Sequence, residues 1–127
     1  MTGQRSLGLA LWATDVFALA DFLGAVTGWE VVGRHPGFAV LEAGGQRIEV
    51  HADEAYRGHP WFAALAREGV ARGIGAELRF EVDDAGRSYQ EALKGGALAI
   101  AAPYEYEGGV ECQVMGPDGY VLTLWHR

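Results

Sequence analysis

The sequence lacks the features of disulfide-bonded and membrane proteins. Its 127 residues include one cysteine, Cys112, which excludes an internal disulfide and predicts a reducing, cytoplasmic location. No apolar run approaches the ~20 residues that a membrane-spanning helix needs, so no membrane association is expected. The apolar run at 7–13 is followed by Asp15, and its alternating pattern predicts a strand and not a signal peptide.

Positive charge is also scarce. Ten Lys and Arg residues face 17 Asp and Glu residues, which gives a formal net charge of -7, and nine of the ten basic residues are arginines. An acidic chain repels phosphate backbones, so nucleic acid is not expected as a partner. The charge balance favours a cationic or neutral small molecule.

Apolar residues and glycine are abundant. Hydrophobic residues make up 50% of the chain, which is enough for a core and excludes a disordered protein. The 19 glycines indicate many tight turns. A chain of this length suits a single domain, spanning residues 1–127.

Hydrophobic periodicity predicts the same order of elements twice. In the first half a strand is followed by a helix that Thr14-Asp15 caps and Gly28 ends, and then by three strands at 29–34, 38–43 and 46–52. In the second half a strand at 76–82 precedes a helix capped by Asp83-Asp84 and three strands at 97–102, 110–115 and 120–125. The result is an α+β fold of two βαβββ modules, 5–52 and 74–127, joined by a linker helix within 53–73.

A family resemblance rests on particular segments of these two modules. They are residues 9–15, Phe22-Leu23, 28–31, 82–84 and the closing turn at 115–120, where Gly116-Pro117-Asp118-Gly119 resembles a DPDG hairpin with glycine in its first place. In these segments the chain resembles the vicinal oxygen chelate superfamily, which includes glyoxalase I, bleomycin-resistance proteins and extradiol dioxygenases. The resemblance implies two curled half-barrel sheets with helices on one face and a ligand cleft on the other. It also implies a homodimer, because members commonly complete their cleft across subunits.

Strand alternation predicts which side chains face that cleft. Leu7, Leu9 and Leu11 are expected to face the helices, as are Ile48 with Val50, Leu122 with Leu124, and the alternate residues of 76–82. The expected ligand-binding residues on the opposite faces are Trp12, Arg47, Glu49, His51, Glu77, Arg79, Glu81, Thr123 and Trp125. Aromatic walls with carboxylates suit a flat or cationic small molecule.

The resemblance also implies four positions for metal ligands, one on each of four cleft strands. Carried over to this sequence, they fall on Gly8, Glu49, Glu77 and Thr123. Only Glu49 and Glu77 carry ligands suited to a divalent metal, with His51 able to join them through a change of strand register. We therefore expect no cofactor, with a divalent metal held by these residues as the alternative.

The function expected from these residues is metal-free binding of a small molecule in an acidic, aromatic-lined cleft, with antibiotic sequestration as one form of it. The alternative is a metal-dependent lyase, isomerase or dioxygenase of the same superfamily. A third hypothesis makes His51 a general base oriented by Glu49, without a metal. Against all three stands a simpler interpretation, in which Glu77, Arg79 and Glu81 form a solvated strand face with mutual ion pairs.

Two further expectations concern the second module. Cys112 is expected to pack as a small apolar group, because no partner base for a nucleophile is evident. Residues 103–109 alternate tyrosine and glutamate before Gly108-Gly109, which predicts a loop. Such a loop either folds over a ligand or forms an exposed turn.

Overall fold

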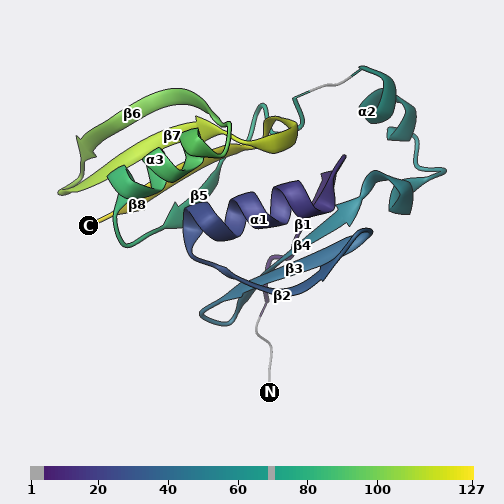
Figure 1. Ribbon diagram of the computed structural model, residues 1–127, viewed down its shortest axis with the longest axis horizontal. Helices are drawn as coiled ribbons and strands as arrows, with labels where there is room; N and C mark the ends of the chain where they lie inside the picture. The colour runs from purple at the N-terminus through teal and green to yellow at the C-terminus, as the bar shows by residue number, and fades with distance from the viewer. Residues whose placement is uncertain (1–4, 69–70) are drawn as a thin grey trace.

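The protein forms two βαβββ units in the computed structural model, which describes residues 5–68 and 71–127 (Figure 1). The first unit consists of β1 (Leu9–Ala13), α1 (Val16–Thr27), β2 (Glu30–His35), β3 (Phe38–Ala43) and β4 (Gln46–Ala52). The second consists of β5 (Leu78–Glu81), α3 (Ala85–Lys94), β6 (Leu98–Tyr106), β7 (Gly109–Met115) and β8 (Val121–His126). The predicted α+β class and the doubled order of elements are confirmed.

Each unit folds into a mixed four-stranded sheet of the same topology. The strand orders are β1-β4-β3-β2 and β5-β8-β7-β6. The first strand of each unit runs parallel to the last, and the remaining pairs are antiparallel. The register places Ala10 beside Glu49 in one sheet and Arg79 beside Thr123 in the other.

The two long helices begin at the predicted caps. The carboxylate of Asp15 accepts a hydrogen bond from the Ala18 amide at 3.1 Å, and that of Asp84 accepts one from the Arg87 amide at 3.1 Å. Helix α1 ends at Gly28, whose φ of 82° lies in the left-handed region that glycine adopts without strain. These caps fix where each helix leaves its first strand.

Apolar side chains on one face of each sheet pack against α1 and α3 and form the core. Leu11, Ile48 and Val50 are buried in the first unit, as are Leu122 and Leu124 in the second, as their alternation predicts. Cys112 is fully buried among them, which agrees with its predicted packing role. The prediction for Leu7 is wrong, because β1 begins at Leu9 and leaves the Leu7 side chain 95% exposed.

The two units meet along their helices and at the turn before β8. Helices α1 and α3 are in contact (Figure 1), and the Phe22 ring of α1 reaches over to the second unit. A Cβ atom on Gly116 would lie 2.8 Å from Cε2 of Phe22, so only glycine leaves room for this ring. The glycine in the first place of the closing turn therefore serves the packing between units.

Hydrogen bonds tie the same turn to the end of β1. The Tyr120 hydroxyl donates to the carbonyl oxygen of Trp12 at 2.6 Å and accepts from its amide at 3.0 Å. Asp118 accepts from the amide and the hydroxyl of Thr14 at 3.1 and 2.9 Å. Arg72 donates to both carboxylate oxygens of Asp53, at 2.7 and 2.8 Å, and is almost fully buried. Burial raises the pKa of Tyr120, and the bonds to Asp53 raise the pKa of Arg72.

Two segments differ from the elements expected for them. Within 53–73 the structure forms a short 3-10 helix, Asp53–Tyr56, and the helix α2, Phe62–Glu68, while residues 69 and 70 lie outside the described part of the chain. The predicted loop at 103–109 is wrong, because β6 continues to Tyr106 and turns at Glu107 and Gly108. Of the helices in the described ranges, none is long and apolar enough to cross a membrane.

Candidate functional site

A cleft of about 880 Å³ lies between the two units, and residues of both line it. The segment 6–10 and β4 line it on one side, and the start of β5 lines it on the other. Its apolar lining includes Leu9, Ala10, Trp29, Leu78 and Phe80. Both halves of this chain contribute to the lining.

Two carboxylates and two guanidinium groups supply the charged lining of the cleft. On the first unit, Nε of Arg47 lies 3.3 Å from an oxygen of Glu49. On the second, Arg79 donates to Glu77 at 2.7 Å. Because each carboxylate has an arginine beside it, the positive and negative charges of the lining balance. The lining therefore differs from the acidic cleft that was expected from the sequence.

The open face of the second sheet, meaning the face turned away from α1 and α3, carries a hydrogen-bonded network. Arg79 also donates to Glu111, whose side chain is only 3% exposed. Gln113 donates to Glu77 at 3.2 Å and to the buried Thr123 hydroxyl at 3.1 Å. The bonds to Glu77 and Glu111 raise the pKa of Arg79, so this guanidinium stays charged and fixed in direction at the edge of the cleft.

The open face of the first sheet carries aromatic rings instead. The Tyr56 ring stacks on Trp12, with centroids 3.5 Å apart and an interplanar angle of 14°. His51 meets Phe38 edge-on at 4.8 Å, and its Nε2 lies 3.1 Å from a carboxylate oxygen of Glu49. Tyr56 follows β4 in the short 3-10 helix, so the linker covers this face. Burial, followed by the charge of Glu49, raises the pKa of Tyr56.

The nine expected ligand-binding residues therefore fall into three places. Arg47, Glu49, Glu77 and Arg79 come together in the cleft. Trp12 and His51 belong to the aromatic cluster of the first sheet. Thr123 is buried beneath Gln113, whereas Glu81 and Trp125 lie side by side in the register of β5 and β8, outside the lining of the cleft.

Three of the four positions at which the resemblance places metal ligands line this cleft. Gly8, Glu49 and Glu77 line it, and Thr123 lies behind Glu77 through Gln113. Their donors do not suit a divalent cation, because Gly8 offers no side chain and each glutamate is already bound to an arginine. Nor do three or more His, Cys, Asp or Glu side chains gather into a metal-binding group anywhere in 5–68 or 71–127.

The sequence did not predict several of the residues that lie around the site. Trp29 and Phe80 form its aromatic lining, with rings edge-on at 5.6 Å, and neither was among the expected ligand-binding residues. Glu111 shares the cleft-facing alternation of Gln113, so the strand pattern contained a signal for it. Tyr56 gave no such signal, because its place depends on how the linker folds back.

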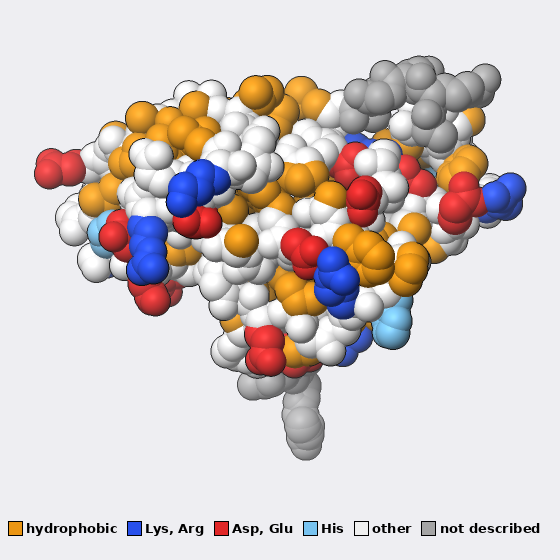
Figure 2. Space-filling model, viewed as in Figure 1, with side chains coloured by type: hydrophobic (Ala, Val, Ile, Leu, Met, Phe, Trp, Pro, Cys, Tyr) orange, Lys and Arg blue, Asp and Glu red, His pale blue; other side chains and the backbone are white. Residues whose placement is uncertain are grey.

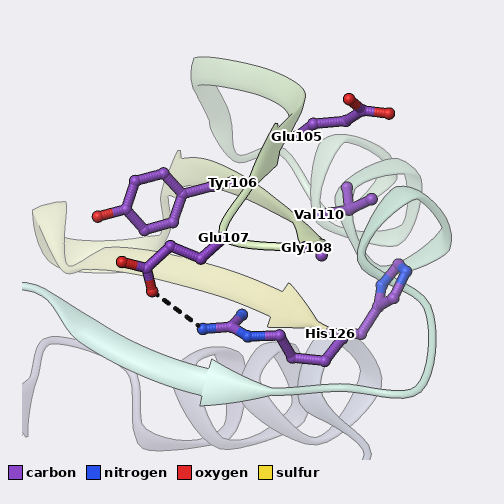
Figure 3. A pocket seen from close by; sticks show the side chains of 8 residues that line it. Glu105, Tyr106, Glu107, Gly108, Val110 and His126 are labelled. Atoms are coloured by element: carbon purple, nitrogen blue, oxygen red, sulfur yellow. Dashed lines mark hydrogen bonds and ion pairs between the residues drawn. The ribbon is translucent and has the colours of Figure 1, made fainter.

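A second hollow of about 590 Å³ lies at the β6–β7 hairpin and the end of β8. Its carboxylates, Glu105 and Glu107, point to opposite sides (Figure 3), and Glu107 is paired with Arg127 at 3.5 Å. His126 is occupied as well, since its Nδ1 accepts the Ala85 amide at 2.8 Å and so caps α3. None of the expected site residues lines this hollow.

Solved structures share this architecture over nearly the whole chain. A glyoxalase/bleomycin resistance protein/dioxygenase family enzyme from Burkholderia phytofirmans PsJN is 27% identical, with a TM-score of 0.72, covering 93% of this chain and 94% of its own. A glyoxalase-related enzyme from Fulvimarina pelagi is 18% identical, with a TM-score of 0.74 and coverage of 98% and 88%. A glyoxalase/bleomycin resistance protein/dioxygenase from Nocardioides is 20% identical, with a TM-score of 0.68 and coverage of 99% and 85%.

The other two comparisons gave no match, since no protein-family model and no curated protein resembles the chain closely enough. The two structures below 25% identity establish the fold alone.

Proposed function

By its fold this chain belongs to the vicinal oxygen chelate superfamily, and from that premise we propose that it binds a small organic molecule in the cleft between its units without a metal ion. This proposal rests on which residues occupy the four positions at which the resemblance places metal ligands. Glycine and threonine occupy two of them, and the glutamates at the other two are neutralised by Arg47 and Arg79.

The lining favours a ligand with an apolar body and polar groups of both signs. Trp29, Phe80 and Leu78 offer apolar surface, while the two arginine–glutamate pairs offer donors and acceptors on facing walls. A ligand that brings both a donor and an acceptor can exchange its own groups for these pairs. Antibiotic capture without chemical change is one form of such binding, and relatives are named for bleomycin resistance.

Tryptophan fluorescence tests this proposal after the protein has been treated with a chelator. Titration with bleomycin, which is cationic, and with 8-anilinonaphthalene-1-sulfonate, which is anionic and amphipathic, is expected to give a saturable change from Trp29 with at least one probe. Trp29→Phe should remove the change. Trp125→Phe is the matched control and should keep it, because Trp125 lies outside the lining.

Elemental analysis of the untreated protein separates this proposal from a metal-dependent enzyme. Stoichiometric Ni, Mn, Fe or Zn that is lost in Glu49→Ala and Glu77→Ala, with probe binding that requires it, would support a lyase, isomerase or dioxygenase instead. Absence of a saturable response to either probe would count against metal-free binding in the cleft.

A further inference from the structure

The Arg79–Glu77 pair on the second wall of the cleft is held from behind by further side chains. Arg79 donates to Glu77 at 2.7 Å and also to Glu111, whose side chain is 3% exposed. Glu77 accepts in addition from the amide of Gln113 at 3.2 Å, and the same amide donates to the Thr123 hydroxyl. Each member of the pair therefore keeps a partner when a ligand group replaces the other member, so neither charge is left unpaired.

Pairs of opposite charge occur elsewhere on the protein, and Figure 2 shows blue side chains beside red ones on the face in view. The pair on the facing wall of the cleft is looser. Nε of Arg47 lies 3.3 Å from Glu49, and its NH1 lies 3.9 Å from Glu42, a second carboxylate that is about half exposed. An arginine placed in this way can turn between its two partners, whereas the buried Glu111 fixes the direction of Arg79. The second wall is therefore the preorganised one.

Apolar surface borders this pair. Leu78 and Phe80, which directly follow the two charged residues in the sequence, also line the cleft. The Trp29 ring of the lining meets Phe80 edge-on at 5.6 Å. A charged pair beside aliphatic and aromatic surface suits a ligand whose charged end is compact and whose remaining body is apolar. The cleft volume of about 880 Å³ leaves room for such a body.

A carboxylate and an ammonium on one carbon atom match this pair. Standard bond lengths place the nitrogen and an oxygen of such a group about 3 Å apart, close to the 2.7 Å between Nη1 of Arg79 and Oε1 of Glu77. With the ligand carboxylate against the guanidinium and the ligand ammonium against the glutamate, the four charges alternate in sign. A head group with a single charge satisfies only one member of the pair, and a purely anionic one is also repelled by the net charge of -7.

We propose that the second wall of the cleft recognises the zwitterionic head group of an α-amino acid with an aromatic or large apolar side chain. Arg79 binds the carboxylate, Glu77 binds the ammonium, and the amino acid side chain lies against the apolar lining. Glu111 is a positioning residue, because it holds Arg79 and does not itself line the cleft. This inference specifies the ligand of the cleft and so rests on the binding function proposed above.

Isothermal titration calorimetry with ligands that share one apolar body tests the proposal. Phenylalanine carries both charges, phenethylamine only the positive one, 3-phenylpropanoate only the negative one and 2-phenylethanol neither. Phenylalanine should bind at least about fivefold more tightly than each of the others, because each of them lacks one or both of the partly exposed ion pairs. Equal or tighter binding of either singly charged analogue would overturn the proposal.

A charge-removing variant identifies the group that binds the ammonium. Glu77→Gln can still accept from Gln113, and it should weaken phenylalanine binding at least about fivefold without weakening that of 3-phenylpropanoate. Glu81→Gln is the matched control, because it makes the same change of charge on the same strand, outside the lining, and should leave both affinities unchanged. Equal losses in these two variants, or a loss of the preference for phenylalanine in Glu49→Gln and not in Glu77→Gln, would overturn the proposal.

A second variant tests the carboxylate end and keeps a cation beside the buried Glu111, so that the protein folds, which circular dichroism checks. Arg79→Lys should weaken phenylalanine and 3-phenylpropanoate alike, because lysine lacks the planar fork of a guanidinium, and unchanged affinities would contradict its role. Saturable binding of bleomycin or 8-anilinonaphthalene-1-sulfonate that Trp29→Phe removes, with no binding of phenylalanine, would overturn the amino acid ligand alone. No response to any of these probes would overturn the binding function as well.

Discussion

The two sheets have the same topology but differ in the side chains that dominate their open faces. On the first sheet Trp12 is stacked against Tyr56. On the second, Arg79 is held by Glu77 and Glu111. Part of the difference comes from the linker, because the 3-10 helix that follows β4 places Tyr56 on Trp12 of the first sheet. The first face adds packed rings to its Arg47–Glu49 pair, whereas the second is held by a larger network of paired charges.

The largest expected loss of stability comes from removing an arginine from the charged network on the open face of the second sheet. Arg79→Ala removes the cation beside the buried Glu111 and should lower the free energy of unfolding by about 2–4 kcal/mol. Arg47→Ala is the control, because its pair with Glu49 is about half exposed and should contribute less than about 1 kcal/mol. Urea unfolding followed by circular dichroism measures both, and equal losses would mean that Glu111 is not held by Arg79.

Removing the ring that covers Trp12 on the first sheet should cause a smaller loss of stability. Tyr56→Ala removes the ring stacked on Trp12 and should cost about 1–2 kcal/mol of unfolding free energy. The exposed Trp12 should then emit at longer wavelength. Tyr106→Ala, at an exposed ring of the second unit, is the control for removing a tyrosine, and an unchanged emission in Tyr56→Ala would contradict the stack.

The smallest expected effect is a loss of folding stability at alkaline pH that arises in the second unit, because only this unit contains a thiol. Burial raises the pKa of Cys112 to about 11 from an ordinary value of 9.0. The unfolded chain therefore loses its thiol proton first, and the folded state loses stability as the pH rises from about 9 to about 11. The loss amounts to about 1 kcal/mol by pH 10.

The variant Cys112→Ala should lose less stability than the wild type over this range. The tyrosines ionise in both proteins and cancel in the comparison. Parallel curves of unfolding free energy against pH for the two proteins would show that Cys112 contributes nothing to the alkaline loss.

Most of the fold was predictable, because it depends on short-range patterns. Alternation placed Ile48 and Val50 on the helix side, and the caps at Asp15 and Asp84 located both helices. The extent of β6 was not predictable in the same way, because Pro103 favours a break and only pairing with β7 continues the strand.

The candidate site was predictable only in part. Alternation says which face a side chain takes, and it correctly separated Glu49 and Arg79 from the core. It does not say which inward residues meet, because that depends on how the two units pack at Phe22 and Gly116. Trp12 was expected in the cleft, yet Tyr56, from a linker without clear periodicity, lies on its ring.

The placement of both cleft walls in a single chain has a consequence for how such a protein can change over generations. Where two identical subunits build a pocket, each substitution appears on both walls at once, and a residue suited to one wall must suit the other. In a tandem chain each half mutates separately. Here each wall holds one arginine–glutamate pair, and new ligand preferences can arise by altering one wall while the other is inherited intact.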